Sequence, residues 1–181
     1  VTAYAHARGL RVGGHVPAFM RAEEAVRAGY DELHHINQVV LNFLVKPTDD
    51  TRTLARFYLV TEGAAGLELD SARVQDFIAL LKERGTVVDP TLTIHEYMFT
   101  QEQGSINPSY AAVFDHVPVA LQRQWRSNSL DVNARNIARH RASYRQLEAF
   151  TVQMYRAGIP IVAGTDSIPG FTLHRELEIY A

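Results

Sequence analysis

Histidine and aspartate side chains stand at the ends of short β-branched runs in this sequence. His15 follows residues 10–14, His34 and His35 follow a second run, and Asp166 ends an unalternated apolar run. Imidazole and carboxylate groups bind zinc, and a carboxylate beside the ion can take a proton from water whose pKa the ion lowers. The sequence therefore predicts a divalent metal site, with zinc as the expected ion and Asp166 as both ligand and catalytic acid/base.

Only one of the adjacent residues His34 and His35 can point into such a site. Successive side chains of a strand lie on opposite faces, so the two imidazoles are predicted to point in opposite directions. Strand alternation alone leaves open which histidine faces the metal.

Two further histidines lie where a substrate pocket is expected. His95 follows the run 86–93, and the loops after strands of α/β barrels commonly determine specificity. His174 lies near the start of the last predicted helix. We expect both histidines to bind substrate, with Thr91 and Thr93 at the same edge.

A regular alternation of helices and short strands must position these residues. This alternation is typical of a parallel sheet, in which catalytic groups gather at the carboxyl ends of the strands. Two arrangements fit it: half of a (β/α)₈ TIM barrel, or a flavodoxin-like open sheet. The predicted strands are 10–15, 30–36, 86–93 and 159–166, and the longer predicted helices are 19–28, 71–84 and 131–157.

The segment 95–128 interrupts this alternation. It contains Gly104, Pro108 and Pro118 as helix breakers, and it is predicted to be an irregular, partly helical insertion. An earlier apolar segment, 37–45, is not assigned to a helix or strand. The aromatic residues of the insertion are expected to form a small core of their own: Tyr97, Phe99, Tyr110, Phe114 and Trp125.

Composition narrows the classes of function. The chain has 181 residues, 46% of them hydrophobic, and a formal net charge of −2. No basic run interleaved with aromatic residues appears, so nucleic acid is not an expected partner. No apolar run reaches the length of a membrane-spanning helix, so a membrane is not expected either. With no cysteine, disulfides and thiolate metal sites are excluded, and the compartment stays open between cytoplasm and periplasm.

Three segments resemble the amidohydrolase superfamily, in particular its imidazolonepropionase-like and peptide-cleaving members. Gly-Gly-His15-Val-Pro, Ala-Gly-Tyr-Asp-Glu-Leu-His-His35-Ile-Asn and Gly-Ile-Pro-Ile-Val-Ala-Gly-Thr-Asp166-Ser resemble its strands five, six and eight. The resemblance implies that His15 and His35 bind the more exposed metal, with His34 at a position that is usually acidic. It also implies that Asp166 contacts a second metal and handles the proton, so one or two ions are expected.

Other parts of that family pattern have no counterpart in the chain. The family's His-x-His pair and its bridging carboxylated lysine would precede Val1, and Lys46 and Lys82 do not match the lysine position. We therefore expect residues 1–181 to be a single incomplete domain, the second half of a catalytic barrel. Strands five to eight would be present, with the insertion after strand seven.

The function that the resemblance implies is hydrolysis of a C–N bond in a small molecule or peptide: an amide, a cyclic amide or a dipeptide. The alternative is a non-catalytic half-barrel that pairs with a missing half or with a second copy as a homo-oligomer, because half a barrel exposes two sheet edges. A barrel enzyme of another kind, such as a decarboxylase or isomerase, would suit the same metal site. Dinucleotide binding is not expected because Gly13 and Gly14 are not part of the spaced glycine pattern that opens a pyrophosphate-binding helix.

Overall fold

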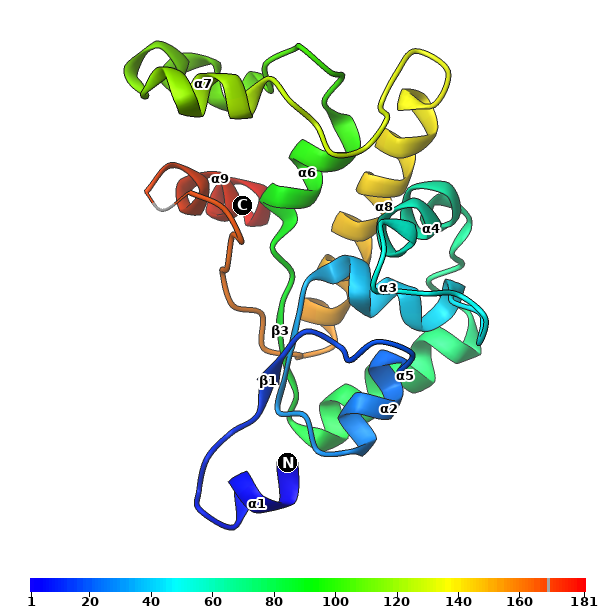
Figure 1. Cartoon of the computed structure of the whole chain (residues 1–181). Helices are drawn as coiled ribbons and strands as arrows, with labels where there is room; N and C mark the ends of the chain where they lie inside the picture. The colour runs from blue at the N-terminus through cyan, green and yellow to red at the C-terminus, as the bar shows by residue number, and fades with distance from the viewer. Residues whose placement is uncertain (169) are drawn as a thin grey trace.

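A three-stranded parallel sheet lies at the centre of the computed structural model, which describes residues 1–168 and 170–181 (Figure 1). The strands are β1 (Gly13–Gly14), β2 (Glu32–His34) and β3 (Val87–Asp89), in the order β1-β2-β3. Each neighbouring pair is parallel. The α/β class and the parallel sheet predicted from the alternating pattern are confirmed, whereas the described residues form an open sheet and not a barrel.

β2 and β3 end earlier than predicted because the backbone turns sharply after each of them. His35, directly after β2, has φ of +65°, and Thr91, two residues after β3, has φ of +48°. Neither conformation continues an extended strand. Pro90 lies between β3 and Thr91 and has no N–H to donate to a sheet. The predicted third strand therefore stops before Thr91, and a helix follows it.

The predicted fourth strand, 159–166, is reduced to one parallel bridge between Val88 and Ile161. Val88 donates its N–H to the carbonyl of Pro160 and accepts the N–H of Val162. Further along, the N–H of Gly164 binds the side-chain carboxylate of Asp89 at 2.9 Å and not a backbone carbonyl. The side chain of Asp89 thus takes the place of the next ladder bond and ends the pairing.

Helices α2 (Ala22–Arg27), α3 (Ile36–Leu44) and α5 (Ala72–Arg84) lie to one side of the sheet (Figure 1). The predicted helix 71–84 is confirmed to within one residue as α5. The apolar segment 37–45, for which the sequence predicts neither helix nor strand, lies almost entirely in the helix α3, whose first seven residues are all buried. Only His35 separates β2 from α3, so the end of the strand and the start of the helix have fixed positions relative to each other.

Three more helical segments pack behind α3: α4 (Ala55–Gly63), the 3₁₀ helix η1 (Ala64–Gly66) and α8 (Ile137–Arg156). Helix α8 begins six residues later than the predicted 131–157. The side chains of Asn133 and Asn136 accept backbone N–H groups ahead of it, which favours a turn over a helix there. The buried face of α8 completes the main core with Tyr144, Leu147, Phe150 and Met154.

Beyond the sheet, α6 (Leu92–Thr100) belongs to the main core, since Met98 and Phe99 pack there. After it come the 3₁₀ helix η2 (Pro108–His116) and α7 (Val119–Trp125), at the end of the molecule opposite α1 (Thr2–His6) (Figure 1). The predicted small aromatic core is confirmed in part: Phe99 joins the main core, and the separate cluster comprises Tyr110, Phe114, Val117 and Trp125.

The last helix, α9 (Phe171–Tyr180), packs against α6 and fixes its start. Glu176 of α9 is fully buried and accepts the backbone N–H groups of Leu92 and Thr93 at 2.8 and 2.7 Å. The first N–H groups of an α-helix have no hydrogen-bond partner within the helix, and Glu176 supplies one for these two. No helix among the described residues has the length and apolar character needed to cross a membrane.

Candidate functional site

Three residues that bracket the candidate site share an uncommon backbone conformation. His35, Thr91 and Asp166 have φ of +65°, +48° and +48°. In the described part of the chain, Phe19 is the other non-glycine residue with positive φ. Such conformations cost free energy in L-residues and are often found at functional sites. The turns bring these three residues to one edge of the sheet.

His15 and His35 meet at this edge through their imidazole rings. Their Nε2 atoms lie 2.6 Å apart and the ring centroids 4.5 Å apart. His35 comes from the end of β2, and His15 follows β1, the neighbouring strand. The other ring nitrogen of His35, Nδ1, lies 2.8 Å from the hydroxyl of Thr91. His35 is therefore held at both nitrogens.

The pKa of His35 is lowered to about 4. Burial of the ring is the main cause, and the nearby Asp166 carboxylate works in the opposite direction. His35 is consequently neutral at pH 7, which is the protonation state that a histidine metal ligand needs.

Asp166 lies near His35 and is exposed to solvent. Its Oδ2 lies 3.9 Å from Nε2 of His35, and its side chain is 63% exposed. The ligand atoms of His15, His35 and Asp166 do not all come within 4.8 Å of one another. The structure thus brings the two histidines into contact and leaves Asp166 further out, in reach of water.

The two imidazoles fit a zinc ion once their rings part slightly. Zn–N bonds of about 2.1 Å in tetrahedral geometry separate two ligand nitrogens by roughly 3.3 Å, against the 2.6 Å between His15 and His35. His15 is exposed, whereas His35 is largely buried and bonded to Thr91 as well. Metal-binding histidines commonly form a hydrogen bond through the ring nitrogen that does not face the metal. Thr91 forms such a bond with His35.

His95 lies inside the protein, on the first turn of α6. The ring is 1% exposed, its centroid lies 6.4 Å from that of His35, and its Nδ1 is 2.8 Å from the carbonyl of Thr91. Burial lowers the pKa of His95 to about 4. His95 lines a small cavity of about 50 Å³ together with His15, His35 and Asp166. The sequence pattern predicts His95 at the start of an irregular insertion, whereas the structure has it in a helix beside the histidine pair.

His174 has a different position. It lies on α9 with an exposed side chain and does not line the cavity beside His15 and His35. The structure therefore does not bring it together with the other predicted site residues.

Several residues of the site were not predicted from the sequence. Gln38 of α3 accepts the N–H of Val16 at 2.6 Å and so fixes the turn after His15. Asn37 and Arg56 line the same small cavity as His95. Gln38 lies one helical turn after His35, a spacing that would have indicated a shared face had 37–45 been recognised as a helix.

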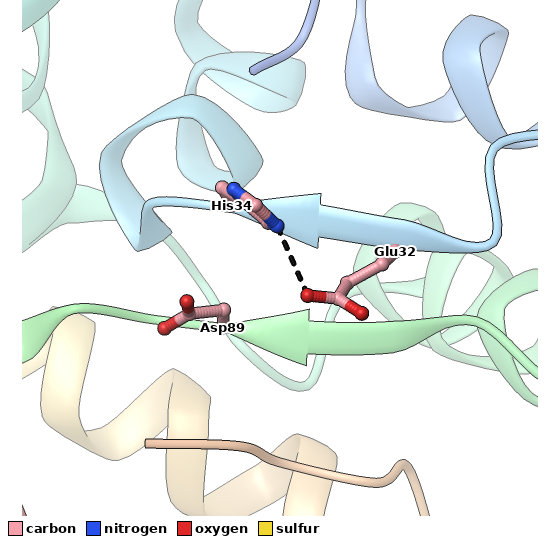
Figure 2. A group of neighbouring side chains, drawn as sticks. All are labelled: Glu32, His34 and Asp89. Atoms are coloured by element: carbon pink, nitrogen blue, oxygen red, sulfur yellow. Dashed lines mark hydrogen bonds and ion pairs between the residues drawn. The ribbon is translucent and has the colours of Figure 1, made fainter. Parts of the chain in front are cut away.

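His34 joins a second group of side chains on the sheet (Figure 2). Its Nε2 lies 2.9 Å from Glu32 of the same strand, and Asp89 of β3 stands beside them. One ligand atom from each residue lies within 4.8 Å of the others. Burial raises the pKa of Asp89, whose carboxylate also accepts the N–H of Gly164. Acidic groups like this are common without an ion, and the cluster carries no metal assignment.

Comparisons with known proteins identify no family for this chain. No protein-family model matches the chain, and neither a curated protein nor a solved structure matches it.

Proposed function

We propose that this chain carries part of the active site of a metal-dependent hydrolase that cleaves a C–N bond. One observation carries the proposal: His15 and His35 meet through their Nε2 atoms at the carboxyl ends of neighbouring parallel strands. Active sites of parallel α/β proteins form at this edge of the sheet. The hydrogen bond from His35 to Thr91 further supports a metal-binding role for His35.

In this proposal His15 and His35 hold a divalent ion, with zinc the expected metal. Zinc bound there would supply Lewis acidity and lower the pKa of water. Thr91 keeps His35 in one orientation, and Gln38 keeps the backbone after His15 in place. Asp166, whose carboxylate is mostly exposed, accepts a proton from water and passes it to the leaving nitrogen.

The finer fold and the reaction rest on the resemblance to the amidohydrolase superfamily. Parallel strands with helices to one side agree with four units of a (β/α)₈ barrel, which further strands would close. The site then holds one or two metal ions, and the substrate is a small molecule or peptide with an amide, cyclic amide or dipeptide bond. A nucleic acid or a membrane is not part of this proposal.

The zinc content of the purified chain tests the metal site. We expect wild-type protein to bind zinc, and we expect His15→Gln and His35→Gln to bind it at least tenfold more weakly, as measured by titration and elemental analysis. His116→Gln is the matched control, since His116 is an exposed histidine of η2. Equal zinc binding by all four proteins would contradict the metal assignment.

The role of Asp166 is tested separately by hydrolysis of a panel of dipeptides and N-acyl amino acids. Asp166→Asn removes the proton acceptor and is expected to lower the rate by 10²-fold or more where the wild type is active. A variant that kept its zinc and its full activity would show that Asp166 does not handle the proton.

A second proposal rests on the edge of the sheet. Within the described residues β1 pairs with β2 alone, so the other side of β1 is open. Open edges pair readily with another strand. The chain would then be a non-catalytic half-barrel that pairs with a second copy or with a separate half. The mass of the protein in solution, together with its zinc content, distinguishes the two proposals. A monomer that binds zinc tightly favours the hydrolase, and a zinc-free dimer favours the half-barrel.

A further inference from the structure

Two adjoining cavities open beside the histidine pair. The larger, of about 320 Å³, and the smaller, of about 50 Å³, share His15, Gln38 and Arg56 in their walls. The smaller one is completed by Asn37 and His95 among others. Together they form a hollow that runs from the candidate metal ligands towards solvent.

Arg56 of α4 stands at the junction of the two cavities as a cation without a counter-ion. No hydrogen bond or ion pair of its guanidinium is found among residues 1–168 and 170–181, and the group lies 4.8 Å from the centroid of the Phe57 ring. The neighbouring Arg52, by contrast, is bound through two nitrogens to Asp50. A planar guanidinium without a partner is well suited to bind a carboxylate through two hydrogen bonds.

Asn37 lines the smaller cavity and has a side-chain amide without hydrogen-bond partners among the described residues. The residue is 1% exposed, and neither its Nδ2 nor its Oδ1 has a hydrogen-bond partner in the described structure. Buried polar groups without partners are rare in folded proteins, and a ligand with a complementary donor and acceptor would satisfy both atoms. A peptide-like amide has both.

The rest of the hollow is suited to an apolar group. The wall of the larger cavity includes the apolar residues Val16, Met20, Leu41 and Val45 besides Arg56. An apolar side chain held there would lie next to a carboxylate on Arg56. A carboxylate at the junction, an amide in the smaller cavity and an apolar side chain in the larger one can branch from a single carbon, as they do in an N-acyl amino acid or at the carboxyl-terminal end of a dipeptide.

We propose that the hollow binds the substrate as an anion, an N-acyl amino acid or dipeptide whose free carboxylate pairs with Arg56. Its amide hydrogen-bonds to Asn37 and its apolar side chain occupies the larger cavity. The inference rests on the proposed hydrolase function, because the substrate amide is to be cleaved beside His15 and His35. Arg56 is then the residue that determines specificity for the charge of the substrate.

Binding of two matched probes tests the charge preference. N-acetyl-L-leucine is an anion, and N-acetyl-L-leucinamide has the same shape without the charge. In titrations of the whole chain followed by NMR, we expect wild-type protein to bind the acid at least tenfold more tightly than the carboxamide. Arg56→Gln should abolish the difference, and Arg56→Lys should restore part of it. Arg135→Gln, which removes an exposed cation elsewhere, should leave it unchanged.

Asn37→Ser tests the amide contact independently. We expect it to weaken both probes several-fold while the acid stays the tighter ligand, since the variant removes the amide contact and keeps Arg56. Equal affinity of the wild type for both probes, or a tenfold preference that survives Arg56→Gln, would overturn the anion site. Unchanged affinities in Asn37→Ser would overturn the amide contact.

Zinc content of the same samples separates this inference from the proposed function. Wild-type protein that holds zinc and does not discriminate between the probes overturns the anion site alone. Protein that discriminates and holds no zinc contradicts the hydrolase, and with it the assignment of the anion as substrate.

Discussion

The hydroxyl of Thr91 lies 2.8 Å from Nδ1 of His35, and both residues have positive φ at the ends of neighbouring strands. The bond joins the end of β2 to the start of α6 across 56 positions of sequence. Thr91 also accepts a hydrogen bond from His95 through its backbone carbonyl. One residue therefore fixes the rings of two histidines that line the same cavity.

Replacing Thr91 by valine removes this hydroxyl while the side chain stays β-branched. We expect Thr91→Val to weaken zinc binding by about 10- to 100-fold, the usual effect of losing a partner of a ligand histidine. Thr151→Val is the control: it removes another buried hydroxyl, which binds the carbonyl of Leu147 within α8. Zinc titrations of both variants measure the difference, and equal affinities would show that Thr91 does not orient His35.

Gly164 approaches Asp89 so closely that a Cβ there would overlap with the carboxylate. Gly164→Ala is therefore expected to destabilise the protein by about 1–3 kcal/mol, the usual cost of overpacking. Gly66→Ala is the matched control, since a Cβ at Gly66 meets no atom within 4 Å. Urea unfolding followed by circular dichroism measures both changes. A Gly164→Ala protein as stable as the wild type would indicate that residues 162–166 can shift away from β3.

Burial of His95 makes stability depend on pH. Its pKa in the folded protein is about 4, below the ordinary histidine value of 6.5, so the unfolded chain binds the proton more readily. Its contribution to stability is complete above pH 6.5 and is lost as the pH falls from 6.5 to 4. The loss amounts to about 3 kcal/mol at most.

The measurement compares wild type with His95→Gln in urea at several pH values, with a chelator present so that no metal contributes. The variant should be less stable at pH 7, and its stability should fall less steeply between pH 6.5 and 4. Parallel curves for the two proteins would mean that His95 titrates at its ordinary pKa.

The sequence alone determined the class of fold and the order of the three strands with the helices α2, α5 and α8. Short β-branched runs bounded by glycine and proline predict strands, and the alternation with helices predicts a parallel sheet. Helix 71–84 was predicted closely because its apolar face and its final glycine, Gly85, are local signals. The same pattern placed His15, His35 and Asp166 at strand ends, since strand ends are marked by neighbouring residues.

Only the tertiary structure decided how these side chains meet. The backbone at His35 has positive φ where its ring meets His15, and the pattern of residue types does not encode that angle. The fourth strand stops after one bridge because Asp89, 75 residues away in sequence, captures the N–H of Gly164. Burial of His95 and Asn37 depends on how α6 and α3 pack. Such long-range contacts arise when distant segments fold together, so no local pattern predicts them.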